Sequence, residues 1–196
     1  MAHEYYTSSD LRKLGIKSVG ENVRISKKAE IVGLENIKIG RNVRIDSFVV
    51  LLCGRGELQI GSNVHIEPLA SIVSHHGIYI GDFCTISHGV RLFTASANYG
   101  GEYFTNGFPN NEFQKPIIGS IVLGNHVIIG ANSVVLPNLK LGDGVGVGAL
   151  SFVRQSLEPW TIFAGNPLRE LGKRARNIER IGDSITNVDG TSKHFE

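Results

Sequence analysis

The sequence predicts an all-β protein, a parallel β-helix wound from six-residue repeats. An aliphatic residue followed by Gly and a polar residue returns along the chain, as in Val19-Gly20-Glu21, Ile60-Gly61-Ser62 and Ile80-Gly81-Asp82. An aliphatic residue also recurs at every sixth position between these tripeptides. This period matches neither a helix of 3.6 residues per turn nor an alternating strand. It indicates short strands joined by tight turns, with one aliphatic side chain per side of a triangular coil pointing inward.

Composition narrows the class of protein. The 196 residues suffice for one domain with a substantial core, and the 24 glycines suit a fold that turns at every corner. A net charge of +2 argues against a nucleic-acid binder. No apolar run approaches the roughly 20 residues of a membrane span, and the N-terminus lacks the apolar core of a signal peptide. We therefore expect a cytoplasmic protein, with Cys53 and Cys84 reduced and packed.

The chain is expected to begin with a short N-terminal helical segment within residues 1–18. Ser9 or Asp10 can cap this helix, and Leu11 and Leu14 belong to its apolar stripe. The β-helix domain follows over residues 19–162. Its first coils step by 20 or 21 residues and its later ones by 18, so the first coils carry two or three extra residues at one corner.

The repeat is interrupted at residues 97–117, a segment rich in Asn, Gly and aromatic residues. A long loop inside a compact repeat is usually functional, so we expect a protruding loop that takes part in binding. Residues 163–182 are predicted to form a basic C-terminal helix with Pro167 near its start. Residues 183–196 are polar and are expected to be a disordered tail.

The segment IGANSVVLPNLKLGDGVGVGALSFV, followed by EPWTIFAGNPLRELGKR, resembles the hexapeptide-repeat acyltransferases. The resemblance covers roughly residues 5–175 and points to the sugar acetyltransferases of the maltose and galactoside acetyltransferase-like superfamily. It implies a left-handed coil, a homotrimer with active sites between subunits, acetyl-CoA as co-substrate and no metal. It implies an acceptor that is a sugar or nucleotide (amino) sugar of surface polysaccharide biosynthesis. Whether the acetyl group goes to oxygen or nitrogen stays open.

The resemblance also implies which residues contact acetyl-CoA. Ala131 and Ala149 have small side chains, which would let the pantetheine arm approach the backbone. Arg169 and Lys173 are expected one helical turn apart, placed to meet the CoA phosphates. The full set of cofactor-binding candidates is Ala131, Ala149, Ser151, Arg154, Arg169 and Lys173.

The catalytic base is harder to assign than the acetyl-CoA contacts. Acyl transfer needs a group that takes the acceptor's proton. Related enzymes place a His where this chain has Ala97. One coil earlier the chain carries His75 and His76, at positions that face the cleft in relatives. We predict that His75 or His76 is the catalytic base, with Glu67 orienting it or holding the acceptor. The substrate-binding candidates are Glu67, His88, Asn98 and Tyr99.

Two other classes of protein are compatible with the coil. One is a trimeric scaffold without catalysis, which the Ala97 position would favour. The other is a zinc protein like the γ-carbonic anhydrases, which needs three His around the metal. Those enzymes show a His followed five residues later by a second His, whereas His88 is followed at that spacing by Phe93.

Overall fold

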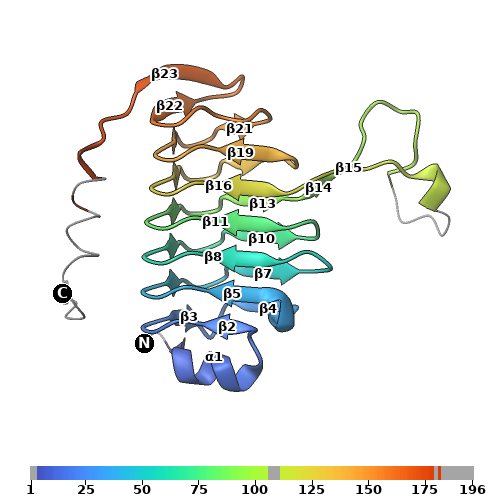
Figure 1. Ribbon diagram of the computed structural model, residues 1–196. Coiled ribbons are helices and arrows are strands. Elements are labelled where there is room, and N and C mark those ends of the chain that lie inside the picture. The colour runs from blue at the N-terminus through green and yellow to red at the C-terminus, as the bar shows by residue number, and fades with distance from the viewer. Residues whose placement is uncertain (1–3, 106–110, 179–180, 182–196) are drawn as a thin grey trace.

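The computed structural model describes residues 4–105, 111–178 and 181, and its main body is a parallel β-helix (Figure 1). Three sheets form the sides of a triangular prism, and each coil contributes one short strand to each sheet. The prediction of a hexapeptide-repeat β-helix is therefore confirmed. No helix among these residues is long and apolar enough to cross a membrane.

We name the three sheets A, B and C. Sheet A contains β1 (Tyr5–Thr7), β3 (Arg24–Ser26), β6 (Arg44–Ile45), β9 (His65–Ile66), β12 (Thr85–Ile86), β17 (Ile128–Ile129), β20 (Gly146–Val147), β22 (Thr161–Ala164) and β23 (Arg169–Lys173). Sheet B contains β2 (Ser18–Val19), β5 (Ile37–Ile39), β8 (Leu58–Ile60), β11 (Ile78–Ile80), β16 (Ile121–Leu123) and β19 (Leu139–Leu141). Sheet C contains β4 (Glu30–Val32), β7 (Val50–Cys53), β10 (Ser71–Ser74), β13 (Arg91–Phe93), β18 (Val134–Val135) and β21 (Phe152–Val153).

The chain visits the sheets in the order B, A, C, so each coil turns at a B–A, an A–C and a C–B corner. Strand register stacks the inward aliphatic residues directly above one another. In sheet A the fully buried column runs through Ile25, Ile45, Ile66, Ile86 and Ile129. Because these side chains fill the interior of the coil, a ligand has to bind on its outer surface.

Two corners carry a residue in the left-handed backbone region in nearly every coil. At the B–A corner these residues are Asn22, Asn42, Asn63, Phe83, His126, Gly144 and Trp160. The first three form an amide ladder, with Nδ2 of each donating to Oδ1 of the next at 3.0 Å. At the A–C corner they include Phe48, Leu69, Asn132 and Leu150. Asn tolerates this conformation well, whereas bulky apolar residues adopt it rarely.

The N-terminal end of the prism is closed by α1 (Ser8–Leu14) (Figure 1). Thr7 is its N-cap, and Asp10 completes a capping box by accepting from the Thr7 backbone. The predicted helix is confirmed, but the predicted cap is wrong because Ser9 and Asp10 lie inside the first turn. Leu11 is fully buried on the coil, whereas Leu14 stays exposed.

The predicted C-terminal helix over residues 163–182 is wrong over residues 163–173, because this segment continues the coil. The strands β22 and β23 form an antiparallel hairpin on the end of sheet A. Phe163 points inward and is 6% exposed, so this stretch extends the hydrophobic column instead of forming an amphipathic helix. Gly165 and Gly172 have positive φ angles that a helix does not use. The predicted tail at residues 183–196 lies outside the described residues.

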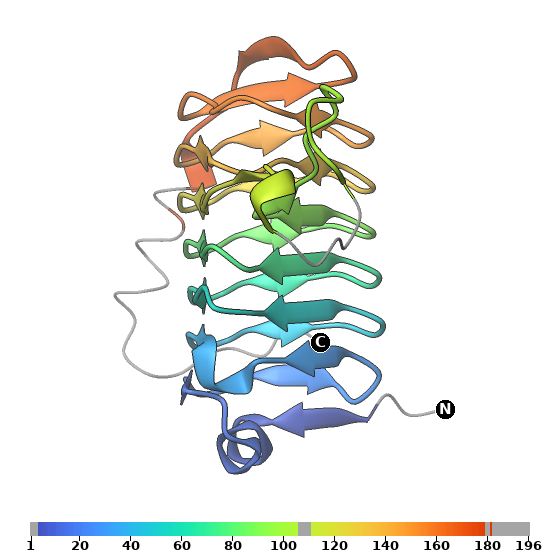
Figure 2. The same cartoon turned by 90° about the vertical axis from the view of Figure 1, so that its right-hand side faces the viewer.

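The loop predicted at residues 97–117 is an arm that projects far from the prism (Figures 1 and 2). It leaves the C–B corner between β13 and β16. Its base is a two-stranded ribbon in which β14 (Ala95–Ser96) pairs antiparallel with β15 (Ile117–Ile118). A 3-10 turn, η2 (Asn111–Phe113), lies farther out.

The extra residues of the first coils lie at this same C–B corner. They form the 3-10 turn η1 (Leu34–Asn36) and the turns that follow β7 and β10. Cys53 and Cys84 are both buried and free, as predicted.

Candidate active site

The predicted site residues lie at two different corners of the prism, on either side of sheet C. Glu67 follows β9 by one residue, and His88 follows β12 by two, at the A–C corner. Ala131 and Ala149 follow β17 and β20 by two residues each, so they stack above His88 along that corner. The other candidates, His75, His76, Asn98 and Tyr99, follow sheet C at the C–B corner. One chain therefore does not bring the two groups together.

At the A–C corner Glu67 and His88 form a hydrogen-bonded pair. Glu67 Oε2 lies 2.6 Å from His88 Nδ1 and also accepts from the His88 backbone N–H at 3.1 Å. The His88 side chain is 58% exposed and that of Glu67 24%. Among the described residues His88 Nε2 has no hydrogen-bond partner, so this nitrogen is open to the surface.

One coil below, Asp46 occupies the position equivalent to Glu67 and is nearly buried. Its Oδ1 accepts from Arg44 Nε at 2.8 Å and from the Tyr5 hydroxyl at 3.3 Å. Its Oδ2 lies 2.7 Å from His65 Nε2. Burial opposes ionisation of this carboxyl, but the hydrogen bonds from His65 and Arg44 outweigh it, so the pKa of Asp46 lies below its ordinary 3.8.

The lowered pKa of Asp46 predicts a pH dependence of stability. A carboxyl with a depressed folded pKa contributes stability that is present above pH 3.8 and is lost as the pH falls through the folded pKa. We expect Asp46→Asn to lower the free energy of unfolding at pH 7 by about 2 kcal/mol, as for a lost charged hydrogen bond. The deficit should shrink between about pH 4 and pH 2, as measured by urea denaturation. An equal deficit at both pH values would contradict an ionised Asp46.

At the C–B corner a buried hydroxyl holds the backbone of the histidine pair. The fully buried Thr94 accepts through Oγ1 from the backbone N–H groups of His75, at 2.8 Å, and His76, at 3.2 Å. Thr94 Oγ1 in turn donates to the Val73 carbonyl at 2.9 Å. Both imidazoles are exposed. Within one chain Glu67 is bonded to His88 and lies across sheet C from them, so it does not orient His75 or His76.

The remaining acceptor-side candidates, Asn98 and Tyr99, lie where the arm begins. Asn98 Oδ1 accepts from the Gly100 backbone N–H at 2.8 Å, and the Tyr99 side chain is 88% exposed. A strongly exposed aromatic ring at the base of a projecting arm is available to a ligand or to another subunit.

On the cofactor side the small residues follow glycines where the coils stack closely. A Cβ at Gly130 would lie 2.4 Å from the backbone N of Ala149. Ser151 is 2% exposed, and its hydroxyl donates to the Gly148 carbonyl at 2.7 Å and accepts from the Gly165 N–H at 2.9 Å. The Ser151 hydroxyl therefore holds the C-terminal hairpin in place, whereas Arg154 is exposed beside β21.

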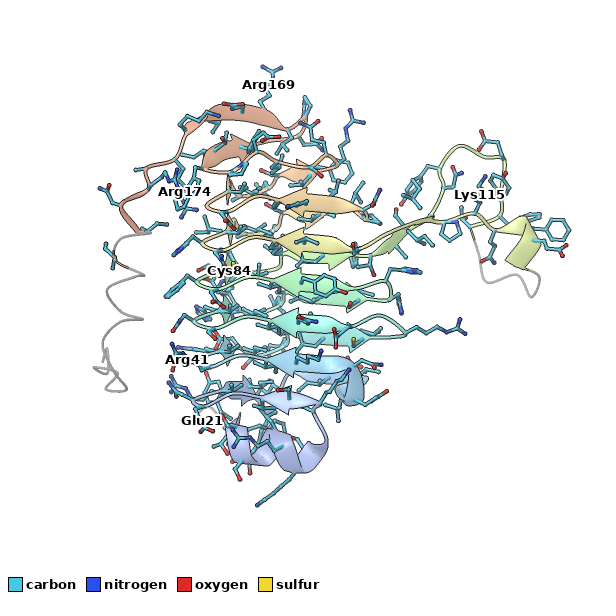
Figure 3. The ribbon with its side chains drawn as sticks, in the orientation of Figure 1. Glu21, Arg41, Cys84, Lys115, Arg169 and Arg174 are labelled. Atoms are coloured by element: carbon cyan, nitrogen blue, oxygen red, sulfur yellow. The ribbon has the colours of Figure 1, made fainter. Side chains whose placement is uncertain are left out.

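The expected geometry of Arg169 and Lys173 is wrong, because both lie in β23 and not in a helix. They are four positions apart along the strand, which corresponds to roughly 13 Å. Arg169 extends from the C-terminal end of the prism (Figure 3). Lys173 Nζ donates to Thr161 Oγ1 at 2.9 Å and lies 3.4 Å from Glu170. The two cations therefore cannot be one turn apart on a shared face.

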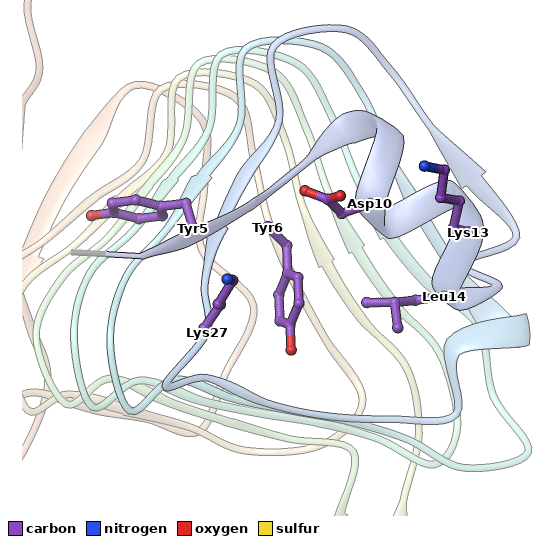
Figure 4. Close-up of a pocket in the computed structure, with 6 residues that line it drawn as sticks. All are labelled: Tyr5, Tyr6, Asp10, Lys13, Leu14 and Lys27. Carbon is purple, nitrogen blue, oxygen red and sulfur yellow. The ribbon is translucent and has the colours of Figure 1, made fainter. Parts of the chain in front are cut away.

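Two open depressions of the described chain lie away from the candidate residues at these corners. An open depression at the N-terminal end is lined by Tyr5, Tyr6, Asp10, Lys13, Leu14 and Lys27 (Figure 4). A second one lies on sheet B around Gly40, Gly61 and Tyr79. Within residues 4–105, 111–178 and 181 no three His, Cys, Asp or Glu side chains are grouped to hold a metal ion.

Sequence reasoning missed the two carboxylate–histidine pairs. The sequence does contain a signal for these pairs. Ile45-Asp46 and Ile66-Glu67 both place an acidic residue after an inward Ile, at the same position in the coil. Aligning the repeats coil by coil would have placed both acids on the A–C corner.

Comparisons with known proteins agree with this architecture. Residues 120–155 match the family model described as bacterial transferase hexapeptide (six repeats). A dTDP-4-amino-4,6-dideoxy-D-glucose acyltransferase from Escherichia coli is 38% identical over 89% of this chain and 91% of its own length. A chloramphenicol acetyltransferase from Klebsiella aerogenes is 34% identical over 52% of this chain and 54% of its own.

A solved structure is similar over nearly the whole fold. AntD, an N-acyltransferase from Bacillus cereus in complex with dTDP and 3-hydroxybutyryl-CoA, is 37% identical with a TM-score of 0.89. The match covers 94% of this chain and 97% of AntD. The chain therefore belongs to the hexapeptide-repeat acyltransferases and is an acyl-CoA-dependent enzyme of that family, not a scaffold without catalysis.

Proposed function

We propose that this enzyme transfers an acyl group from acyl-CoA to the amino group of a dTDP-linked 4-amino-4,6-dideoxyhexose. The observation that carries the proposal is the 38% identity, over 89% of the chain, to the Escherichia coli acyltransferase for that class of sugar nucleotide. A mutant of AntD, which is 36% identical to this chain over 94% of its length, has been solved with dTDP-4-amino-4,6-dideoxyglucose and coenzyme A. The product would be an N-acylated precursor for a surface polysaccharide.

An amine acceptor also fits the residues at the start of the projecting arm. A neutral amine is already nucleophilic, whereas a hydroxyl depends more strongly on a base that removes its proton. This chain has Ala97 where related O-acetyltransferases carry their His. Acyl transfer to nitrogen depends less on a base at position 97.

We further propose that the active site forms between subunits of a homotrimer. The two groups of candidate residues lie on opposite edges of sheet C, and three-fold symmetry would set the C–B corner of one copy against the A–C corner of the next. Exposed apolar residues accompany the A–C corner: Phe48, Leu69 and Leu150 are 57%, 58% and 71% exposed. The arm adds the exposed Phe104 and Phe113. Apolar surface of this kind favours association with another copy.

In this assembly Ala131 and Ala149 would line the acyl-CoA side, and Arg169 would lie toward its phosphates. Arg154, which follows β21 of sheet C, would approach the acyl-CoA from the neighbouring copy. His75, His76, Asn98 and Tyr99 would approach from the neighbouring copy and contact the sugar nucleotide. The prediction that His75 or His76 is the base stays a prediction. Replacing each singly by Ala and measuring kcat tests it, and full activity in both variants would remove both from the mechanism.

The proposed function is tested by mixing the purified protein with acetyl-CoA and dTDP-4-amino-4,6-dideoxyglucose. We expect free CoA to appear together with a sugar nucleotide heavier by one acetyl group, as measured by thiol detection and mass spectrometry. dTDP-glucose, which has hydroxyls but no amine, is the matched control acceptor and should release no CoA above background. Acetylation of dTDP-glucose without transfer to the amino sugar would contradict the proposal.

A further inference from the structure

We propose that His88, oriented by Glu67, is the general base of the acyl transfer. This inference rests on the proposed function, since it names the group that prepares the sugar amine for attack. A sugar amine is largely protonated near neutral pH and must lose a proton before it can act as a nucleophile.

The first argument is the geometry of the pair. A carboxylate 2.6 Å from Nδ1 holds the proton on that nitrogen and leaves Nε2 as the acceptor, as in other base–carboxylate pairs. The same carboxylate oxygen accepts the His88 backbone N–H at 3.1 Å, so the turn that carries the ring is fixed as well. The 58% exposed side chain leaves Nε2 accessible to a substrate.

The second argument is position along the corner. His88, Ala131 and Ala149 each follow an inward residue of sheet A by two positions in successive coils. Coils are spaced by about 4.8 Å, so His88 lies one coil below the first residue of the proposed acyl-CoA side. A base at this place can reach an amine that attacks the thioester carbonyl. His75 and His76 have no carboxylate partner among the described residues.

The proposed step balances as follows. Nε2 of His88 takes one proton from the sugar ammonium, and the nitrogen lone pair then forms the C–N bond to the thioester carbonyl. The C–S bond breaks, and its electron pair leaves on the CoA sulfur. The second proton of the attacking nitrogen passes to that sulfur, which gives the amide and free CoA. The imidazolium afterwards releases its proton to solvent.

Other charged groups at this corner already have partners. Arg91 donates from its guanidinium to the Gly89 carbonyl at 3.0 Å, and Asp46 is bonded to Arg44 and His65 one coil below. Glu67 is therefore the charged group that contacts the His88 ring, and we assign it as a positioning residue.

The test compares His88→Gln, His88→Ala and Glu67→Gln with the wild-type trimer, using acetyl-CoA and dTDP-4-amino-4,6-dideoxyglucose. We expect kcat to fall about 100-fold in the His88 variants, with KM for acetyl-CoA changed less than about 3-fold. Added imidazole should restore part of the rate in His88→Ala. Glu67→Gln should lose about 10-fold in kcat with KM for acetyl-CoA changed less than about 3-fold, because the ring loses the carboxylate that orients it while acyl-CoA binding is untouched.

His126→Gln is the matched control. It removes an imidazole from the B–A corner, where the ring stacks on Phe83 at 5.0 Å, and it should keep the wild-type rate. Hydrolysis of acetyl-CoA, measured without any sugar, is a readout that does not depend on the acceptor, and we expect His88→Gln to lower it too. If the wild type does not acylate the amino sugar, the proposed acceptor fails while hydrolysis still reports on His88. Unchanged kcat and unchanged hydrolysis in His88→Gln would overturn the inference.

Discussion

Replacing Gly81 by Ala is expected to destabilise the coil by about 3 kcal/mol, although it adds a single methyl group. Gly81 follows β11 in sheet B, where the next coil passes directly above it. A Cβ at this position would lie 2.6 Å from both the carbonyl carbon and the oxygen of Gly124. These are backbone atoms, so relief requires two coils to move apart and the hydrogen bonds between β11 and β16 to lengthen. Urea denaturation at fixed protein concentration measures the change.

Gly146→Ala is the control for this prediction. Gly146 lies in β20. A Cβ added there would have Arg174 Cδ as its nearest neighbour, at 3.6 Å, which is an ordinary van der Waals contact. We expect no loss of stability and a gain of up to about 1 kcal/mol, because Ala restricts the unfolded chain. A similar cost in the two variants would show that close approach of the coils is not why Gly recurs at position 81.

The second large effect is expected from Leu69→Lys. Leu69 is 58% exposed at the A–C corner and shares its left-handed position with Phe48 and Leu150. Burial of a Leu side chain contributes about 2 kcal/mol, and a lysine in the proposed three-fold interface would be placed there three times. We expect the proposed trimer to dissociate and acyl transfer to fall at least about 100-fold, as measured by light scattering and by CoA release.

Leu171→Lys is the matched control, because Leu171 is 67% exposed in β23, away from this corner. It should leave both the molecular mass and the rate unchanged. Co-expression gives a second check if the chain lacking His75 and His76 is inactive, as the His88→Gln chain is expected to be. The two chains together should then form mixed trimers in which some clefts carry neither change. Restored activity would support a shared site, and a monomeric wild type with full activity would contradict it.

The coil was predictable because its signal is periodic. Each inward residue such as Ile66 or Ile86 has to be aliphatic, and each close approach such as Gly81 has to lack a Cβ, so the constraints repeat in the sequence. The C-terminal hairpin was not predictable in the same way. Its basic residues also suit a helix, and the open end of sheet A, a tertiary feature, decides that Arg169–Lys173 is a strand.

Sequence reasoning proposed members for the candidate site but not how they pair. Resemblance placed Glu67, His88 and the two histidines His75 and His76 near a cleft. It did not show that Glu67 bonds to His88, because residues 21 positions apart meet only through strand register. The Thr94 hydroxyl that fixes the His75–His76 turn was missed for the same reason.

Stacking of the coils also places equivalent side chains of the site at equal intervals along the prism. Every outward position at the A–C corner repeats at intervals of about 4.8 Å along the prism, on a backbone that hardly changes from coil to coil. Transferring a His, a carboxylate or a small residue from one coil to the next would shift a contact by one fixed increment without altering the fold. Enzymes built this way can adjust to acceptors and acyl chains of different length by relocating single side chains along the same edge.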